Sequence, residues 1–315
     1  MDVHAVTVRD LLVLDRSGHT RLQVASFTLP HGEVCGVYGA SEAAGTLFLN
    51  CVTGFHRPQR GTISIYGQRL PGAGSRRFLV GIVPPEGGLF RDFTARENLD
   101  LALRFFGSKR YSRYDRAQKI QRIVAMLELE PWLETPVRDV SDAVRQRIRL
   151  GCALVHEPQL LVAHNPWGRV DAESRELIER TIRDHANRGN TLLFTAPRAE
   201  DVQALASEIC LFNETSLVAR GTLEHLQQYA EAQETILVTV QNQAARLLEP
   251  VSSLPGVIQS SATDSVVTIQ AKPGFVRLTR LAERVQASGL ELLGMEVRRP
   301  GLADVYAIVV GTGAE

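Results

Sequence analysis

The segment that most constrains the fold is residues 33–52, where an apolar strand, a loop of small residues and a helix follow directly on one another. The strand pattern covers 33–38, and the loop extends from Gly39 to Gly45. Strand, small-residue loop and helix in this order are the architecture of a phosphate-binding loop, whose backbone amides surround an anion. The segment therefore predicts an α/β domain of the phosphate-loop type.

Further strand patterns flank this segment. Residues 160–163 and 191–194 are short apolar runs, and a helix is predicted between them over 174–185. Residues 61–70 have the pattern of a hairpin strand. Because strands that alternate with helices are typical of parallel sheets, we predict a mostly parallel sheet.

Helix signals cluster in the middle of the chain. Thr94 and Glu97 have the spacing of a capping box, a second helix is predicted over 115–129, and Ser141 is placed to cap a third. These helices predict a helical subdomain over about residues 90–155 that interrupts the parallel sheet.

The character of the sequence changes from about residue 232. Strand and helix patterns follow in the order βαββαβ, which predicts a small α+β, ferredoxin-like domain, and a last apolar helix is predicted over 302–310. We place the boundary near 225–235. This gives a first domain of 1–230 and an accessory domain of 231–315.

The balance of acidic and basic residues leaves no net charge that would create a strong electrostatic field around the whole protein. Lys plus Arg and Asp plus Glu are 35 each, so no nucleic acid partner is expected. The four cysteines are widely spaced within apolar stretches, which favours buried free thiols in a reducing compartment over disulfides or a metal site. No leader pattern and no membrane-spanning run is visible, so a cytoplasmic location is expected, with any membrane association made through a partner.

Five segments, in order along the chain, resemble the motifs of ATP-binding-cassette (ABC) transporter ATPases. They are PHGEVCGVYGASEAAGTLFLNCVTGFHRPQRGTISIYG around the phosphate-binding loop, FTARENL at the start of the helical subdomain, VSDAVRQRIRLGCALVHEPQLLVAHNPWGRVDAESR over the signature helix, the second nucleotide motif and the D-loop, VARGTLEHL at the end of the catalytic domain, and RRPGLADVYAIVVG near the C-terminus. Residues 232–315 resemble the C-terminal domain of the daunorubicin-resistance type of exporter ATPase. The resemblance covers essentially the whole chain and implies an ABC-ATPase sheet with a helical subdomain.

The resemblance assigns the phosphate-binding loop to residues 39–46, where Gly45 stands at the family's lysine position. That lysine binds the β- and γ-phosphate oxygens, so the cation of the site is lost. Glu42 adds a carboxylate, and two like charges about 4 Å apart repel by ~4 kcal/mol at an effective dielectric near 20. Thr46 stands at the Mg²⁺ position, although a threonine is also common at a helix start. The vestigial nucleotide-binding positions are Gly36, Gly39, Ser41, Gly45 and Thr46.

The second nucleotide motif ends in Asp-Glu in the family, and here it reads His164-Asn165. Neither residue supplies the anionic oxygen that Mg²⁺ prefers or a carboxylate base. His164 could bind another metal, but a lone histidine in such a strand is more often a hydrogen-bonded core residue. No metal site is therefore expected here.

Three further family positions are altered. Pro85 stands where a glutamine senses Mg²⁺ and water, and Pro197 stands where the switch histidine belongs. Proline carries no side-chain donor, acceptor or base. The aromatic residue that stacks on adenine should fall within 16–19, where His19 could stack weakly and a solvated turn is the alternative.

The signature sequence Leu-Ser-Gly-Gly-Gln is replaced by Val140-Ser141-Asp142-Ala143-Val144. In the family this helix start binds the γ-phosphate held by the opposite subunit. The Asp142 carboxylate would satisfy the helix dipole internally and repel a phosphate. Asp171 in the D-loop and the pair Gln146–Arg147 remain as in the family. Since each composite site combines one subunit's loop with the other's signature, both sites would be impaired.

These losses, in a chain whose apolar periodicity is intact, predict a pseudo-ATPase that needs neither ATP nor Mg²⁺. The resemblance implies an integral-membrane permease as partner, at the inner face of the plasma membrane, with a second, intact ABC ATPase or a second copy of this chain as further partners. The docking candidates are Phe90, Arg91, Phe93 and Arg96, although the two phenylalanines could instead pack in the local core. The alternatives are a weakly active export ATPase and a soluble interaction module no longer tied to transport.

Overall fold

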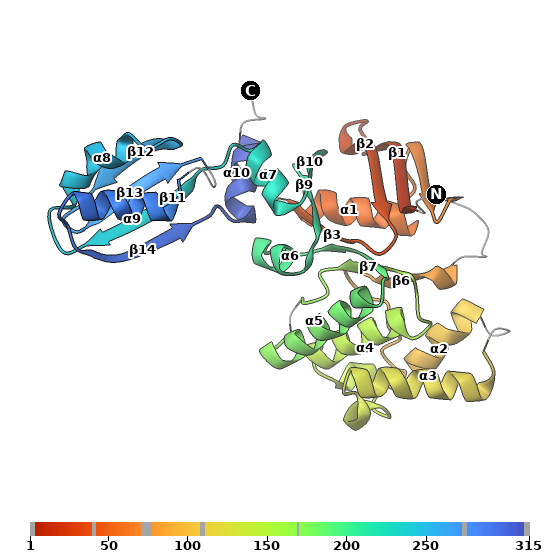
Figure 1. The fold of residues 1–315 in the computed structure, drawn as a ribbon. Helices are drawn as coiled ribbons and strands as arrows, with labels where there is room; N and C mark the ends of the chain where they lie inside the picture. The colour runs from red at the N-terminus through yellow and green to blue at the C-terminus, as the bar shows by residue number, and fades with distance from the viewer. Residues whose placement is uncertain are drawn as a thin grey trace. The chain divides into compact units, whose positions relative to one another are not determined.

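The computed structural model describes residues 4–39, 42–70, 77–107, 111–168, 170–272 and 276–311, and the chain forms two compact units (Figure 1). The first is Met1–Arg220 and the second Gly221–Glu315. The division falls slightly before the expected boundary, because α7 (Leu223–Tyr229) contacts α10 (Leu302–Gly311) of the second unit. None of the helices in the described ranges is long and apolar enough to cross a bilayer.

The first unit begins with an antiparallel sheet, which the sequence did not distinguish from the parallel one. Val8 lies on β1, the strand nearest the N-terminus. It pairs with Phe27 of β2 on one side and with Ile63 of β4 on the other, and all three residues are buried. Buried and more exposed residues alternate along much of β1, β2 and β4, as expected for a sheet with one face on the core. In the order β2-β1-β4-β5, the strands are β2 (Thr20–Pro30), β1 (His4–Leu14), β4 (Arg60–Ile65) and β5 (Gln68–Leu70).

The second sheet has six strands and confirms the predicted parallel core. β3 pairs in parallel with β8 and β9, and β7 pairs in parallel with β6 and β8. Two of its inner strands, β7 and β8, are buried at every position, as is typical of parallel sheets covered on both faces. In the order β10-β9-β3-β8-β7-β6, they are β10 (Leu217–Gly221), β9 (Glu208–Phe212), β3 (Val34–Gly39), β8 (Thr191–Thr195), β7 (Leu160–His164) and β6 (Val80–Val83).

Helix α1 (Glu42–Thr53) packs against β2 of the first sheet and against β3, β7 and β8 of the second. Phe48 on this helix lies 5.1 Å from the Phe27 ring and 5.3 Å from the Phe212 ring, measured between centroids. One side chain thus joins the two sheets into a single core.

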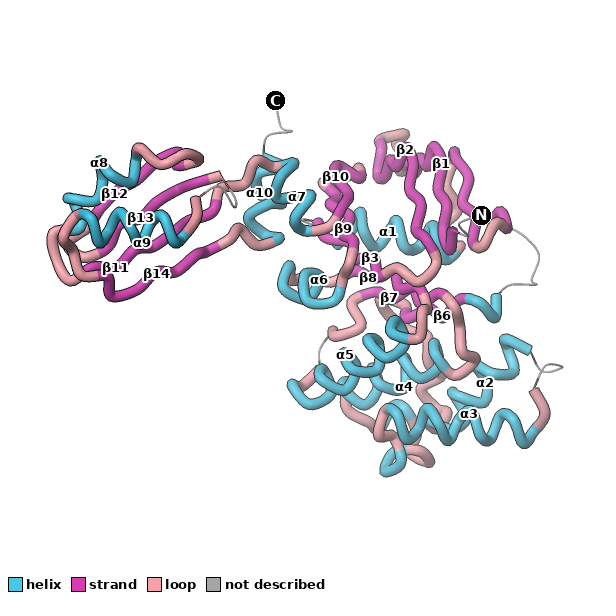
Figure 2. The backbone as a smooth tube through the Cα atoms, in the orientation of Figure 1, coloured by secondary structure: helices cyan, strands magenta, loops and turns pink. Residues whose placement is uncertain are grey.

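The predicted helical subdomain is present (Figure 2). Thr94 and Glu97 form the expected capping box, since each side chain accepts a hydrogen bond from the other's backbone N–H. Ser141 accepts from the N–H of Val144 at 3.3 Å and caps the third helix as predicted. The second helix starts and ends earlier than predicted, because Ser112 and Asp115 form a capping box that the sequence analysis missed. The helices are α2 (Ala95–Gly107), α3 (Arg113–Met126) and α4 (Asp142–Leu154), with α5 (Ala172–Asn187) and α6 (Ala199–Leu205) following along the chain.

The second unit has the predicted βαββαβ order. Its antiparallel sheet has the strand order β12-β13-β11-β14, which is the ferredoxin-like arrangement. The buried residues of this sheet, such as Ile236 and Ile269, form a separate core with Leu281 of α9. The elements are β11 (Glu234–Val240), the 3₁₀ turn Ala244–Leu247, α8 (Leu248–Ser252), β12 (Val257–Ala262), β13 (Val266–Ala271), α9 (Leu278–Ala287) and β14 (Leu292–Arg298).

Candidate functional site

The parallel register brings the altered motifs together at one edge of the six-stranded sheet. Val37 on β3 and His164 on β7 both pair with Thr195 at the end of β8, and Val83 pairs with Ala163 at the ends of β6 and β7. The segments that follow these strands carry residues 85, 164–165 and 197. Ligands of open α/β sheets bind at this carboxyl edge, so the edge is the candidate nucleotide site.

The glycines of the vestigial loop have packing roles. A Cβ on Gly39 would lie 2.6 Å from the carbonyl oxygen of Phe212, and a Cβ on Gly36 would lie 2.5 Å from Val202 Cγ1. Both positions therefore require glycine for close approach of neighbouring elements. Ser41 lies outside the described residues.

Gly45 and Thr46 lie within helix α1, which begins at Glu42. The interpretation of Thr46 as a helix-start residue is therefore wrong, and Thr46 is half-buried several residues into the helix. Gly45 is buried, and a Cβ there would lie 3.0 Å from Val37 Cγ1 and 3.4 Å from Thr195 Cγ2. The position that carries the family's lysine is thus packed against strand side chains.

His164 is a core residue, as expected, but the expectation that it is hydrogen-bonded is wrong. It is 3% exposed, and neither ring nitrogen has a hydrogen-bond partner among the described residues. Burial lowers the pKa of His164 to about 4, so the imidazole is neutral at pH 7. Asn165 follows with a φ of 39°, and its N–H donates to the backbone oxygen of Thr195 at 3.0 Å. No cluster of metal ligands occurs in the part of the chain that the structure describes.

Pro85 and Pro197 are both exposed beside this edge. Just beyond Pro197 lies an ionic cluster around the buried Asp201, which the sequence analysis missed. Asp201, 5% exposed, binds Arg175 of α5 and accepts two hydrogen bonds from Arg198 at 2.8 and 3.1 Å. Burial of the Asp201 carboxyl raises its pKa, but the hydrogen bonds from Arg198 and Arg175 outweigh this effect and hold the pKa below its ordinary value. The cluster therefore fixes the segment after Pro197 to α5.

Asp201→Ala is expected to lower the free energy of unfolding by about 2 kcal/mol, because two guanidinium groups lose their shared partner. Guanidinium chloride unfolding at pH 7.5 measures the change. Arg180→Ala removes the exposed pair with Glu128 and is the control, with an expected change below about 0.5 kcal/mol. Equal effects of the two substitutions would contradict a structural role for Asp201.

The carboxylate at the start of α4 has a partner within the helix that the sequence analysis did not predict. Asp142 forms an ion pair with Arg145, whose second guanidinium nitrogen donates to the Val140 carbonyl at 3.0 Å. Ala143 is buried. A ligand at the N-terminal end of α4 would therefore meet the Asp142 carboxylate, which is already paired with Arg145.

The buried face of α4 is joined to two of the altered segments. Gln146 donates to the Pro166 carbonyl at 3.0 Å, and Arg149 donates to the Gly87 carbonyl at 3.0 Å. Arg147 is buried, with its guanidinium 4.8 Å from the Trp132 ring centroid. These contacts support the architectural role predicted for the pair Gln146–Arg147.

Two other predicted positions have local roles. Asp171 is the N-cap of α5 and accepts a hydrogen bond from the Ser174 N–H at 2.7 Å, a contact that lowers the pKa of its carboxyl. Residues 16–18 form a solvated turn after β1 in which Asp15 accepts the N–H groups of Ser17 and His19. The His19 side chain is 80% exposed and lies beside Asp15. Residues 16–19 therefore match the solvated turn that the sequence analysis gave as the alternative to adenine stacking.

Three of the predicted docking residues, Phe90, Arg91 and Phe93, lie on a turn before α2, and Arg96 lies in the first turn of that helix. Phe90 is 58% exposed and Phe93 41% exposed, so the alternative that they pack in the core is wrong. Their rings stack with centroids 5.3 Å apart. The Phe93 N–H donates to the Phe90 carbonyl at 3.2 Å, which places Arg91 and Asp92 at the centre of the turn.

Asn98 holds this turn in place, and the sequence analysis missed it. It is 3% exposed; its Oδ1 accepts from the Phe90 N–H at 2.8 Å, and its Nδ2 donates to the carbonyl oxygens of Phe90 and Thr94 at 3.0 and 2.9 Å. One feature of the sequence could have identified Asn98: it is a polar residue four positions after the cap Thr94, on the helix face that Leu99 and Leu103 bury. The two exposed rings therefore stand on a preorganised backbone.

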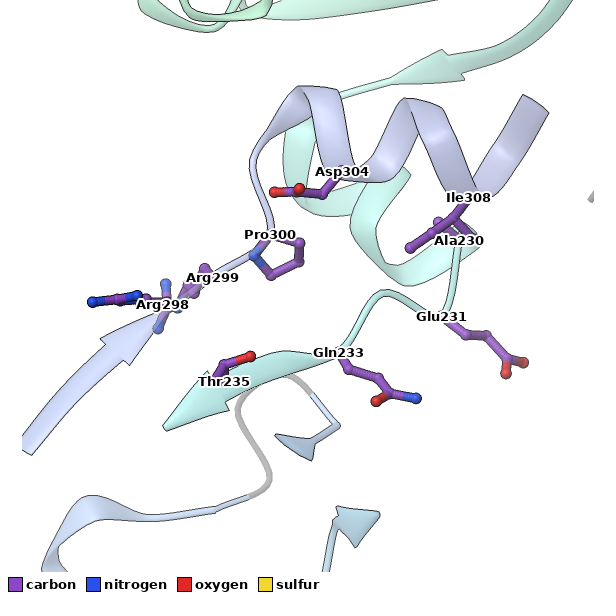
Figure 3. A pocket seen from close by; sticks show the side chains of 9 residues that line it. All are labelled: Ala230, Glu231, Gln233, Thr235, Arg298, Arg299, Pro300, Asp304 and Ile308. Carbon is purple, nitrogen blue, oxygen red and sulfur yellow. The ribbon is translucent and has the colours of Figure 1, made fainter. Parts of the chain in front are cut away.

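The second unit carries a separate groove of about 570 Å³ (Figure 3). Its lining mixes charges of both signs, and Arg298 is already paired with Glu296. All its charged side chains are exposed. The lining residues are Ala230, Glu231, Gln233, Thr235, Arg298, Arg299, Pro300, Asp304 and Ile308. This groove contains none of the residues of the nucleotide-binding motifs and is not a candidate nucleotide site.

Comparison with known proteins agrees with the architecture. Residues 22–168 match the family model described as ABC transporter. The chain is 32% identical over 197 residues to Nod factor export ATP-binding protein I of Sinorhizobium fredii, covering 62% of this chain and 57% of that protein. It is 33% identical over 201 residues to the protein of the same name from Burkholderia orbicola, covering 62% and 64%. The match thus spans less than two thirds of these relatives.

Solved structures show the same fold. The structure of an ATP-binding subunit of an ABC transporter superimposes with a TM-score of 0.65 at 21% identity, covering 71% of this chain and 92% of that one. A dimeric ATP-binding cassette in a post-hydrolysis state, bound to ADP and Pi, gives a TM-score of 0.63 at 19% identity, covering 69% and 98%. The chain therefore has the fold of ABC ATP-binding cassettes, and residues 22–168 of it match the ABC transporter family model.

Proposed function

We propose that this chain is a non-hydrolysing ABC cassette that docks as a structural or regulatory subunit on a membrane-spanning permease, at the cytoplasmic face of the plasma membrane. The observation that carries the proposal is the chemistry of the sheet edge where nucleotide would bind. Gly45, His164 and Asn165 stand there without charge at pH 7, and Pro85 and Pro197 carry no polar side-chain atom.

This edge does not suit a magnesium nucleotide. A triphosphate in a partly desolvated site needs cations to offset its charge, and Mg²⁺ needs anionic oxygen ligands. A side chain at Gly45 would begin 3.0 Å from Val37 Cγ1 and 3.4 Å from Thr195 Cγ2, so little space is available at the lysine position. Neither ATP nor Mg²⁺ is therefore a cofactor under this proposal, and the fold serves as a scaffold.

Docking on a permease is supported by the stacked pair Phe90–Phe93. Exposed aromatic side chains held on a rigid backbone are typical of binding surfaces, because they lose little conformational entropy on association. Arg96 borders the pair and is already bound to Glu134 at 2.5 Å. The family resemblance places the permease contact at this turn, and the export role is suggested by the names of the relatives.

Magnesium ATP at 5 mM is expected to leave the thermal unfolding midpoint unchanged and to give no phosphate release above buffer. A genuine site at 100 times its dissociation constant would stabilise the fold by roughly 2.7 kcal/mol. Differential scanning calorimetry with and without ligand measures the shift, and magnesium sulfate at matched ionic strength is the control. A clear shift with turnover would instead favour the export ATPase that the relatives' names suggest.

A further inference from the structure

We propose that helix α9 of the second unit carries a contact surface for a membrane rich in anionic phospholipid, formed by Arg277, Arg280 and Arg284. These three residues are called the basic flank. The inference goes beyond docking on a permease and does not depend on it. It adds a direct lipid contact to the membrane association through a partner that the sequence analysis expected.

Helix α9 holds the basic flank on a fixed backbone. Leu281 and Val285 of this helix are fully buried in the core of the second unit (Figure 1). The helix ends where the Ser288 N–H donates to the Arg284 carbonyl at 3.1 Å and where Gly289 adopts a φ of 68°. Because the helix is anchored in this way, a membrane would not have to order it on contact, as it must order an unfolded segment.

The three arginines lie on one side of α9. Arg277 is the N-cap residue, Arg280 follows after three positions, and Arg284 follows after four more. Residues at these spacings are neighbours on the surface of a helix. All three side chains are exposed. At 1.5 Å per residue they extend over about 10 Å along the helix axis, so the basic flank is a line of cations.

No carboxylate among the described residues of the second unit neutralises the basic flank. The ion pair of this unit joins Glu296 to Arg298 on β14. Glu283, the acidic residue of α9, follows the same helix but pairs with none of the three arginines. Like charges three or four positions apart on a helix repel each other. The basic flank is therefore unfavourable by itself, and an anionic partner would relieve the repulsion.

The surroundings of the basic flank favour a lipid surface as this partner. Leu278, next in the chain to Arg277, is 40% exposed, so an apolar side chain stands beside the cations. In helices that bind at a membrane surface, apolar side chains enter the boundary of the acyl chains while basic side chains bind the anionic headgroups. Each guanidinium can bind a phosphodiester through two hydrogen bonds, and headgroups in one plane match a line of three.

A nucleic acid would supply the same phosphodiester groups, but the second unit lacks what binds its bases. Proteins that bind single strands stack the bases on aromatic side chains. The four strands of this sheet, β11, β12, β13 and β14, contain no Phe, Tyr or Trp. The basic flank is therefore assigned to lipid, and binding of nucleic acid becomes an outcome of the test.

The test is flotation of the purified chain with vesicles of phosphatidylcholine, either alone or mixed with an equal amount of phosphatidylglycerol. These vesicles contain no permease, so only the lipid contact is measured. Binding to the mixed vesicles at low ionic strength is expected, with none to the neutral vesicles and with loss of binding at about 0.5 M sodium chloride. Inorganic phosphate at matched ionic strength should not displace the chain, because one phosphate group occupies only part of the basic flank.

Substitution of the basic flank gives the size of the effect. Each arginine at an anionic surface should change the partition coefficient about fivefold, so the triple variant Arg277→Gln/Arg280→Gln/Arg284→Gln should bind about 100-fold more weakly. Replacing the same three residues by lysine keeps the charge and should keep binding within about threefold of wild type, because the surface potential acts on charge.

The matched control removes the same charge from the first unit. Three exposed arginines without an ion pair among the described residues are replaced by glutamine, and the partition coefficient should change less than about threefold. The control variant is Arg57→Gln/Arg69→Gln/Arg188→Gln. Thermal unfolding midpoints of all variants should equal that of wild type, because none of the substituted side chains is buried.

Several results would overturn the inference. No binding to the mixed vesicles at low ionic strength, or equal binding to neutral and mixed vesicles, would exclude an anionic lipid surface as the partner. Equal losses in the two glutamine variants would show that the basic flank has no special part in binding. Loss of binding in the lysine variant, or capture of a homopolymeric RNA without capture of vesicles, would assign the arginines to a different ligand.

Discussion

The free energy of unfolding is expected to fall by roughly 6–9 kcal/mol as the pH is lowered from 7.5 to 4, because three buried histidines resist protonation. Burial is the main cause in each case, and it lowers the pKa of His156, His164 and His185 to about 4. A hydrogen bond between His156 and the Val80 carbonyl offsets part of this effect.

The sign of this change is set by proton linkage. In the unfolded chain these side chains titrate near pH 6.5, so between pH 6.5 and 4 the unfolded state binds more protons than the folded state. Stability is therefore complete above pH 6.5 and is lost progressively as the pH falls towards 4, by roughly 2–3 kcal/mol per histidine. Guanidinium chloride unfolding at several pH values gives this curve directly.

His164→Leu isolates the contribution of one of the three buried histidines to this pH dependence. Since neither ring nitrogen has a partner among the described residues, leucine removes unsatisfied polar atoms, and stability at pH 7.5 should be unchanged or higher. The slope between pH 6 and 4.5 should become shallower by about 1.4 kcal/mol per pH unit, which corresponds to one proton. Superimposable curves for wild type and His164→Leu would show that His164 does not titrate in this way.

Sequence reasoning succeeded where the cause is local. The cap at Ser141 and the capping box of Thr94 and Glu97 depend on residues three positions apart, and both were predicted. The parallel sheet and the βαββαβ unit follow from apolar patterns within each strand. The assignment of altered motifs stays a prediction from the resemblance, in which each position is defined by its place in a short sequence.

The features that sequence reasoning missed depend on contacts between residues that are distant in the sequence. Asp201 meets Arg175 across 26 positions, so neither residue indicates the cluster by itself. The burial of His164 followed from its strand, but the absence of a hydrogen-bond partner among the described residues depends on what packs around its ring. Whether Phe90 and Phe93 are exposed depends on Asn98 and the turn that it holds, which no periodicity reveals.

Gly81→Ala is expected to lower the free energy of unfolding by about 3 kcal/mol or more, because the added methyl group would overlap the backbone. Gly81 lies on β6, where a Cβ would overlap the carbonyl oxygen of Ala153 on α4 and lie 2.8 Å from Pro158 Cγ. A flexible side chain could rotate away from such a contact, but a helix carbonyl cannot. Relief therefore requires α4 to move away from the sheet.

The same movement should disturb the candidate site, since α4 donates from Gln146 to Pro166 and from Arg149 to Gly87. Hydrogen exchange of residues 85–99 should therefore accelerate in Gly81→Ala, together with the loss of stability in guanidinium chloride. Gly294→Ala on β14 is the matched control, because a Cβ there meets no heavy atom within 4 Å, and its effect should stay within about 0.5 kcal/mol. If Gly81→Ala were as stable as Gly294→Ala, β6 and α4 could not be in close backbone contact, and the helical subdomain would not be anchored to the sheet at this point.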